Sequence, residues 1–136
     1  MSIVTARKTQ DIARAGDKKA AILEAIGDLS NIKVMQNMVL VATYIRPETT
    51  SGGIVLPDSA LDEDVWQGKV GLVLKLGPVA FETEDGDGRF YVKPNIHDWC
   101  VYRVGDAWDI TVNKVACRLI ADQNVRLVID DPESIF

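Results

Sequence analysis

Residues 68–78 read Gly68-Lys69-Val70-Gly71-Leu72-Val73-Leu74-Lys75-Leu76-Gly77-Pro78. Apolar side chains fill most of this run, and the Gly-Pro pair that closes it favours a turn, so the pattern predicts a β-strand. Segments of similar character, bounded by turn residues, occur on both sides of it, at residues 34–41, 96–102, 108–112, 115–120 and 125–129. Short strands separated by turns predict an all-β fold, either a small barrel or a sandwich.

The start of the chain has a different pattern from the rest. Ile22, Ile26 and Leu29 follow the i, i+4, i+7 spacing of one helical stripe. Asp17 can cap the start of this helix, and the Gly27–Asn31 region can end it. A helix this short needs a surface to pack against. We therefore divide the chain into an N-terminal helical extension, residues 1–31, and a β-barrel domain, residues 32–136.

The composition is that of a globular domain with an acidic surface. The 136 residues suffice for one domain with a core, and 47% of them are apolar and 26% charged. The net charge of −5 argues against duplex nucleic acid and anionic membranes as partners. No apolar run has the length of a membrane span and no signal peptide is recognisable, which favours a cytoplasmic protein.

The two cysteines, Cys100 and Cys117, are far apart and each lies in an apolar, strand-like run. Buried thiols are common in such runs. The chain has no Cys-x-x-Cys spacing and a single histidine. The pattern favours two reduced core thiols over a disulfide or a metal site.

Motifs for catalysis or metal binding fail on inspection. The run Asp85-Gly86-Asp87-Gly88 has the look of a calcium loop. Placing Gly88 at the invariant glycine puts Pro94 where a bidentate glutamate is required. His97 has no nucleophile placed near it by any motif and is expected to be a turn residue, and no phosphate-cradling glycine loop is present. We therefore expect no catalytic residue, no cofactor, no metal site and no enzymatic activity.

The segment between residues 46 and 66 contains an apolar triplet, Ile54-Val55-Leu56. This part of the chain includes Thr49-Thr50-Ser51-Gly52-Gly53-Ile54-Val55-Leu56-Pro57-Asp58-Ser59. The small polar residues before the triplet give the backbone freedom, and Pro57-Asp58-Ser59 favours a turn after it. Three aliphatic side chains are unfavourable in water. They are covered either by the chain's own core, as one more buried strand, or by a partner that binds them.

Several blocks of the chain, in their order and spacing, carry a family resemblance. They are Ile32–Val41, Gly52–Pro57, Gly68–Pro78, Ile96–Tyr102 and Cys117–Asp130. Together they are similar to the GroES-type co-chaperonins, the chaperonin 10 family, over most of the chain. The resemblance implies a small GroES-like β-barrel with a mobile loop at about residues 46–66 and a roof hairpin at about residues 79–95.

The resemblance also implies a function. Members form a heptameric dome that caps a GroEL-type chaperonin ring with ATP or ADP bound, and so enclose substrate proteins. In the family the mobile loop docks an apolar triplet in a groove of the chaperonin, and the matching chaperonin-binding residues here are Gly52, Gly53, Ile54, Val55, Leu56 and Pro57.

Two further sets of residues follow from the same resemblance. The roof hairpin would surround the opening of the dome with the acidic residues Glu82, Glu84, Asp85 and Asp87. The first and last strands of the barrel pair across subunits in the family, which removes exposed strand edges. The subunit-interface residues implied here are Val34, Val39, Val41, Val125, Leu127 and Ile129.

Four features depart from the family pattern. The extension precedes the first strand, the 78–95 stretch is long, His97 stands where the family has glycine, and Asn37-Met38 stands where it has Asp-Arg. This divergence suggests a specialised member encoded by a bacteriophage, one that adapts the chaperonin in its host's cytoplasm to capsid assembly.

Two other functions fit a small acidic barrel. The first is binding of single-stranded nucleic acid, with Tyr44, Phe90, Tyr91 and Trp99 as candidate stacking residues, although such grooves are normally basic. The second is a phage structural module in which the triplet at Ile54 makes a subunit contact.

Overall fold

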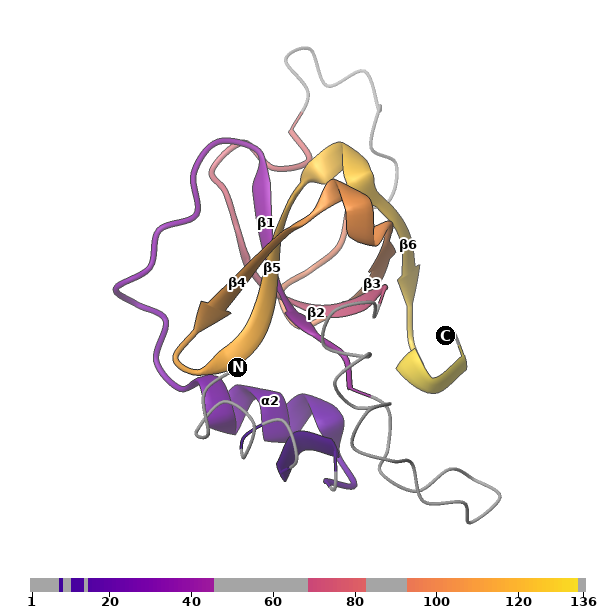
Figure 1. Ribbon diagram of the computed structural model, residues 1–136. Helices are drawn as coiled ribbons and strands as arrows, with labels where there is room; N and C mark the ends of the chain where they lie inside the picture. Colours follow the sequence, from indigo (N-terminus) through magenta and orange to yellow (C-terminus); the bar gives the residue numbers. More distant parts are fainter. Residues whose placement is uncertain (1–7, 9–10, 14, 46–68, 83–92, 135–136) are drawn as a thin grey trace.

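The computed structural model describes residue 8 and residues 11–13, 15–45, 69–82 and 93–134. Within these residues a six-stranded antiparallel sheet curls around an apolar interior, with a short helix across one end (Figure 1). The predicted all-β fold is confirmed. The strands and the helix are α2 (Lys18–Ile26), β1 (Met38–Thr43), β2 (Val70–Leu76), β3 (Trp99–Tyr102), β4 (Trp108–Val112), β5 (Val115–Ala121) and β6 (Val125–Ile129).

The strand order in the sheet is β4-β5-β1-β2-β3-β6. β1 is therefore an inner strand, bonded to β2 on one side and to β5 on the other. The register shifts between Leu40 and Val41 in β1 and between Val101 and Tyr102 in β3. Irregularities of this kind bend strands and increase their twist, which helps the sheet to curl.

The predicted strand boundaries agree closely with the observed ones, except at the starts of β1 and β3. The chain turns at Gln36, which has φ 55°, and the Met38 amide bonds to the Met35 carbonyl at 3.1 Å. The strand expected from Val34 therefore begins only at Met38. Likewise, the strand expected from Ile96 begins at Trp99, because residues 95–98 form a turn with His97 at φ 74°. His97 is thus a turn residue, as predicted.

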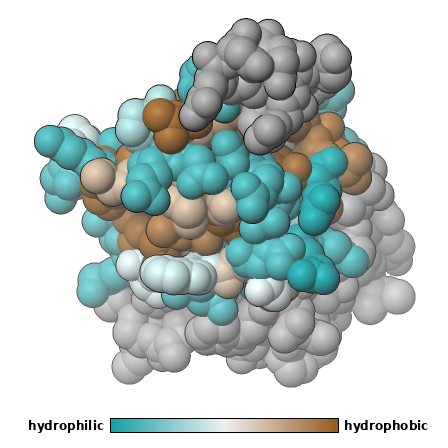
Figure 2. All heavy atoms as spheres, turned by 90° about the horizontal axis from the view of Figure 1, so that it is seen from above, coloured by the Kyte–Doolittle hydropathy of each residue, from teal (hydrophilic) through white to brown (hydrophobic). Residues whose placement is uncertain are grey.

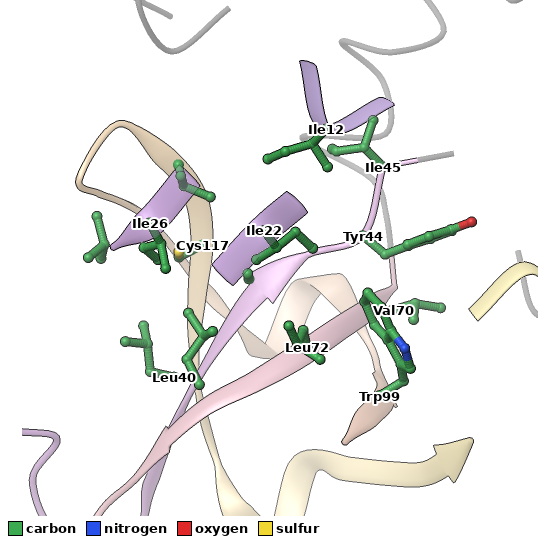
Figure 3. Packing of buried hydrophobic residues seen from close by; sticks show 14 of the residues in the cluster. Ile12, Ile22, Ile26, Leu40, Tyr44, Ile45, Val70, Leu72, Trp99 and Cys117 are labelled. Carbon is green, nitrogen blue, oxygen red and sulfur yellow. The ribbon is translucent and has the colours of Figure 1, made fainter. Parts of the chain in front are cut away.

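Both faces of the sheet are buried. Val39 and Val41 of β1 belong to the cluster on one face, which also contains Phe81 and Tyr102. Leu40 and Ala42 lie on the opposite face of the strand. They belong to a second cluster, whose members include Ile12, Ile22, Ile26, Tyr44, Ile45, Leu72 and Trp99 (Figure 3). An outer face that would otherwise meet water is therefore covered by the N-terminal residues.

Helix α2 begins and ends as the sequence predicts. The Asp17 side chain accepts a hydrogen bond from the Ala20 amide at 3.1 Å, and Gly27, with φ 67°, ends the helix. Ile22 and Ile26 are 0% and 2% exposed, so these two residues of the predicted stripe face the sheet, whereas Leu29 lies beyond the end of the helix. The surface that a short helix needs is the outer face of the barrel, and the two predicted parts of the chain share one cluster.

Gly77 lies where two parts of the backbone touch. A Cβ atom at this position would lie 2.2 Å from the Gln36 carbonyl oxygen and 2.8 Å from that of Met35. Glycine permits this approach because it has no Cβ atom. The contact holds the turn before β1 against the end of β2.

We predict that Gly77→Ala lowers the free energy of unfolding by roughly 1–3 kcal/mol, because the backbone must shift to admit the methyl group. The matched control is Gly105→Ala, since an added Cβ at Gly105 has nothing within 4 Å. Urea denaturation of both variants measures the difference. Equal stability of the two variants would contradict the role assigned to Gly77.

Candidate functional site

The predicted binding loop lies outside the described residues, as do its residues Gly52, Gly53, Ile54, Val55, Leu56 and Pro57. Its two stems are described. The Tyr44 amide donates to the Val70 carbonyl at 2.9 Å, and the Tyr102 amide donates to the Lys69 carbonyl at 3.0 Å. Ile45, the last described residue before the loop, is 2% exposed. Both ends of the loop therefore leave from a hydrogen-bonded part of the sheet; Ile45 at the first end is buried, and Lys69 at the second is exposed.

Two of the four candidate stacking aromatics lie at these stems and are buried. Tyr44 is 1% and Trp99 5% exposed, and their rings meet edge to face with centroids 5.4 Å apart. Stacking of bases requires accessible ring faces. These two residues are part of the core, so they give no support to nucleic-acid binding; Phe90 and Tyr91 lie outside the described residues.

The roof segment is described only at its stems, and Glu84, Asp85 and Asp87 lie outside the described residues. Glu82 is exposed and forms an ion pair with Lys93 on the opposite stem at 3.2 Å. A surface pair of this kind stabilises little, but it joins the two stems and balances the charge of Glu82.

Asp122 holds the first stem of the roof segment by a hydrogen bond. Its carboxylate accepts hydrogen bonds from the Phe81 amide at 2.9 Å and from the Asn37 side-chain amide at 3.0 Å. Asp122 is 5% exposed, so both bonds are shielded from water. It thereby joins the roof stem to the turn before β1, to which Asn37 belongs.

The six predicted interface residues fall into two groups. Val39 and Val41 are 0% exposed inside the chain, and β1 is bonded along both edges, so β1 itself has no edge left to pair with a second copy. Val34 is half-buried and lies ahead of β1, outside any strand. On the other side of the barrel Val125 and Ile129 are half-buried in β6, and Leu127 is 51% exposed.

The two ends of the sheet carry apolar surface. Among the described residues, β4 and β6 each pair with a single strand. Trp108 on β4 is 71% exposed, and β6 exposes Leu127 and Val128. A groove beside β4 is lined mainly by apolar side chains: Ile32, Val34, Met35, Met38, Leu40, Ile110, Val112 and Leu119, with Lys33. Figure 2 shows apolar side chains at the surface on either side of a polar band.

A buried cation links the strands β3, β4 and β5. Arg118 is fully buried, and its guanidinium donates to the Asp109 carboxylate at 2.8 Å and to the Tyr102 hydroxyl at 3.1 Å. Its charge also lies 5.8 Å from the centre of the Tyr102 ring. Burial raises the pKa of Tyr102 to about 12, although the Arg118 cation acts in the opposite direction. This network ties the edge strand β4 to the barrel interior.

The two cysteines are free, buried thiols, as predicted. Cys100 belongs to the cluster on one face of the sheet and Cys117 to the cluster on the other. Burial raises the pKa of each thiol to about 12. Neither is poised as a nucleophile, because the thiolate is the reactive form.

The buried side chains of Cys100, Cys117 and Tyr102 make the free energy of unfolding fall at alkaline pH. The unfolded chain loses its thiol protons near pH 9 and its phenol proton near pH 10, whereas the folded chain keeps them to about pH 12. The folded state then holds more protons, so each group lowers the free energy of unfolding by up to about 1.4 kcal/mol per pH unit in that window.

We therefore expect urea denaturation at fixed protein concentration to show a loss of stability as the pH rises from 8.5 to 10.5, and Cys117→Ala should show a shallower loss. A free energy of unfolding that is flat across this range would contradict the buried, protonated thiols.

The structural roles of Asp122, Arg118 and Trp108 carry no signal that sequence inspection could use. Asp122 and Arg118 look like ordinary surface charges, because their partners are distant in the chain. The sequence predicts a strand at Trp108, but only the strand order shows that this strand lies at one end of the sheet.

Within the described part of the chain, no group of three or more histidine, cysteine or carboxylate side chains could hold a metal ion. Among those same residues, none of the helices is long and apolar enough to cross a membrane.

Comparison with protein families gives one match. Residues 31–129, more than two thirds of the chain, match the family model Cpn10, described as the chaperonin 10 Kd subunit. The match includes every strand of the sheet and leaves out α2. No curated protein matches the chain.

Proposed function

The chain belongs to the chaperonin 10 family of co-chaperonins, the partners of GroEL-type chaperonins, and from this membership we propose how it acts. It assembles into a dome-shaped ring, heptameric as the family resemblance implies, that caps a chaperonin ring carrying ATP or ADP. The capped chamber encloses unfolded or assembling proteins. The observation that carries this proposal is the family match across all six strands.

The loop between Ile45 and Lys69 is the proposed chaperonin-binding element, through Ile54, Val55 and Leu56. Each aliphatic side chain gains about 1.5–3 kcal/mol when it is buried in a partner's groove. Ordering the residues before them, Thr49–Gly53, costs roughly 1–2 kcal/mol per residue and offsets most of this gain. One loop alone therefore binds weakly, but several loops on one ring bind strongly and can be released together.

We expect Ile54→Asp to abolish ATP-dependent capture by a bacterial chaperonin, because a carboxylate cannot enter an apolar groove without a large desolvation penalty. Pull-down with and without ATP measures capture, and native mass spectrometry shows whether the ring is intact. Ser59→Asp adds the same charge to the loop outside the triplet and should be captured like wild type.

Unfolding of the Ile54→Asp protein would instead show that the triplet is a buried strand of the core. Undiminished capture of this variant would show that the triplet is not the contact.

Assembly uses the two ends of the sheet. β6 ends the sheet of the described strands and exposes Leu127, and the groove beside β4, at the other end of that sheet, offers an apolar surface. Two different apolar patches on one chain favour head-to-tail contacts, which close into a ring when the rotation permits. On the groove side, the predicted interface residue Val34 lies in the stretch ahead of β1 and lines the groove. Val39 and Val41 support the interface from the core.

We predict that Leu127→Asp prevents ring assembly and leaves a folded single chain, since the charge would be buried at the subunit contact. Val79→Asp is the matched control: Val79 is 52% exposed, against 51% for Leu127, but it lies in the turn after β2 and belongs to neither β4 nor β6. Native mass spectrometry distinguishes rings from single chains. A ring of unchanged size for Leu127→Asp would exclude β6 from the interface.

The remaining parts of the proposal follow from the family and from the departures. Chaperonin 10 proteins are not enzymes, and hydrolysis of ATP belongs to the chaperonin. We propose that the ring acts in the cytoplasm, and that the chain is phage-encoded and serves capsid assembly in the host. His97 is one of the departures on which the proposed origin rests, and it holds φ 74°, a conformation that favours the glycine usual in the family.

A further inference from the structure

The N-terminal extension lies outside the family match, which begins at residue 31. Its described residues nevertheless fill the outer cluster of the barrel: Ile12, Ala13, Ile22 and Ile26 are all at most 3% exposed. These residues are part of the core, although the extension lies outside the family pattern. The contacts at the two ends of the extension indicate its role.

Lys18 fixes the bend between the two helical parts of the extension. Residues 11–13 are helical, and α2 begins at Lys18. The Lys18 ammonium is buried and donates to the Ile12 carbonyl at 2.8 Å and to the Ala13 carbonyl. A cation at the end of a helical turn satisfies carbonyls that have no partner within the helix and interacts favourably with the helix dipole. The direction of residues 11–13 relative to α2 is thereby set.

The far end of α2 is tied to the sheet. The Lys8 ammonium donates to the carbonyls of Ala25 at 2.7 Å and of Asn113 at 2.8 Å, and the Asn113 side chain donates to the Ile26 carbonyl at 2.6 Å. Asn113 belongs to the turn between β4 and β5. The extension therefore cannot slide along the barrel, because it is held to the sheet at this end.

The near end of the extension covers the root of the binding loop. Ile12 and Ile45 belong to the same buried cluster, and Figure 3 shows their side chains next to each other at its end, beyond Tyr44. Gly16–Lys19 line a hollow together with Tyr44, Trp99 and residues 131–133. The backbone at Tyr44 and Ile45 is thus enclosed by the extension, immediately before the chain enters residues 46–68.

We propose that the N-terminal extension is a positioning element for the chaperonin-binding loop. By packing Ile12 on Ile45 it fixes the point and direction from which the loop leaves the barrel. This rests on the proposed function of the loop. A fixed departure lowers the ordering cost of docking in each subunit, and the effect multiplies over the loops that one ring presents.

The test compares two truncations of the same residue type. Ile12→Ala and Ile26→Ala each remove three carbon atoms from the outer cluster, at 3% and 2% exposure, but only Ile12 lies at the loop root. Affinity for an ATP-loaded bacterial chaperonin, measured by surface plasmon resonance, is compared with thermal stability and with ring size from native mass spectrometry. Ile12→Val is the milder variant, should Ile12→Ala fail to fold.

We expect Ile12→Ala to bind at least about 10-fold more weakly than wild type, since a loss of about twofold per loop multiplies across a ring. Ile12→Val should bind with intermediate affinity. Ile26→Ala should lose similar stability and keep wild-type affinity, a difference that a purely structural role of the extension would not produce.

Equal affinities of Ile12→Ala, Ile26→Ala and wild type would overturn the positioning role while leaving the proposed function intact, provided that Ile54→Asp fails to bind. Wild-type protein that does not bind the chaperonin at all would overturn the proposed function itself.

Discussion

The burial of β1 on both faces and its pairing along both edges is the constraint on which the rest of the structure depends. Its five residues from Val39 to Thr43 are buried without interruption, whereas a strand with one face in water would alternate. One face needs the barrel interior and the other needs a cover. The cover is the N-terminal extension, so residues far from the sheet in sequence become part of its core.

Because β1 is an inner strand, the outer edges of the sheet formed by the described strands belong to β4 and β6. Exposed edges with apolar side chains invite pairing with further chains. A ring that joins one end of the sheet to the other end of the next copy leaves no such edge open. β1 ends at Thr43, and Tyr44 and Ile45 lead from it into the proposed binding loop. The position of β1 therefore bears on both the proposed assembly and the proposed chaperonin contact.

Buried polar groups connect the segments around this core. Asp122 joins the roof stem to the turn before β1, Lys18 holds the two helical parts of the extension together, and Arg118 links β4 to the interior. Each satisfies its hydrogen bonds with partners distant in the fold or at a chain turn. Such groups specify one arrangement, because any other would leave a charge buried without a partner.

The positions of β4 and β6 could be predicted to the residue, because apolar runs bounded by turn residues mark them. The caps of α2 were also predictable, since Asp17 and Gly27 act on their own neighbours. The turns that make β1 and β3 begin later than expected could not be predicted. Gln36 and His97 take positive φ values that their residue types do not announce, and the close approach of Gly77 and the bonds of residues 95–98 impose them.

By itself, the sequence determined the strands, the capped helix, the reduced thiols and the apolar triplet between glycines and a proline, because periodicity, capping and turn preference act over a few residues. Only the tertiary structure decided which strands lie at the edges, which face the helix covers and which charges are buried together. Those outcomes depend on contacts between residues distant in the chain, such as Asn37 with Asp122 and Lys8 with Asn113. No local pattern records them.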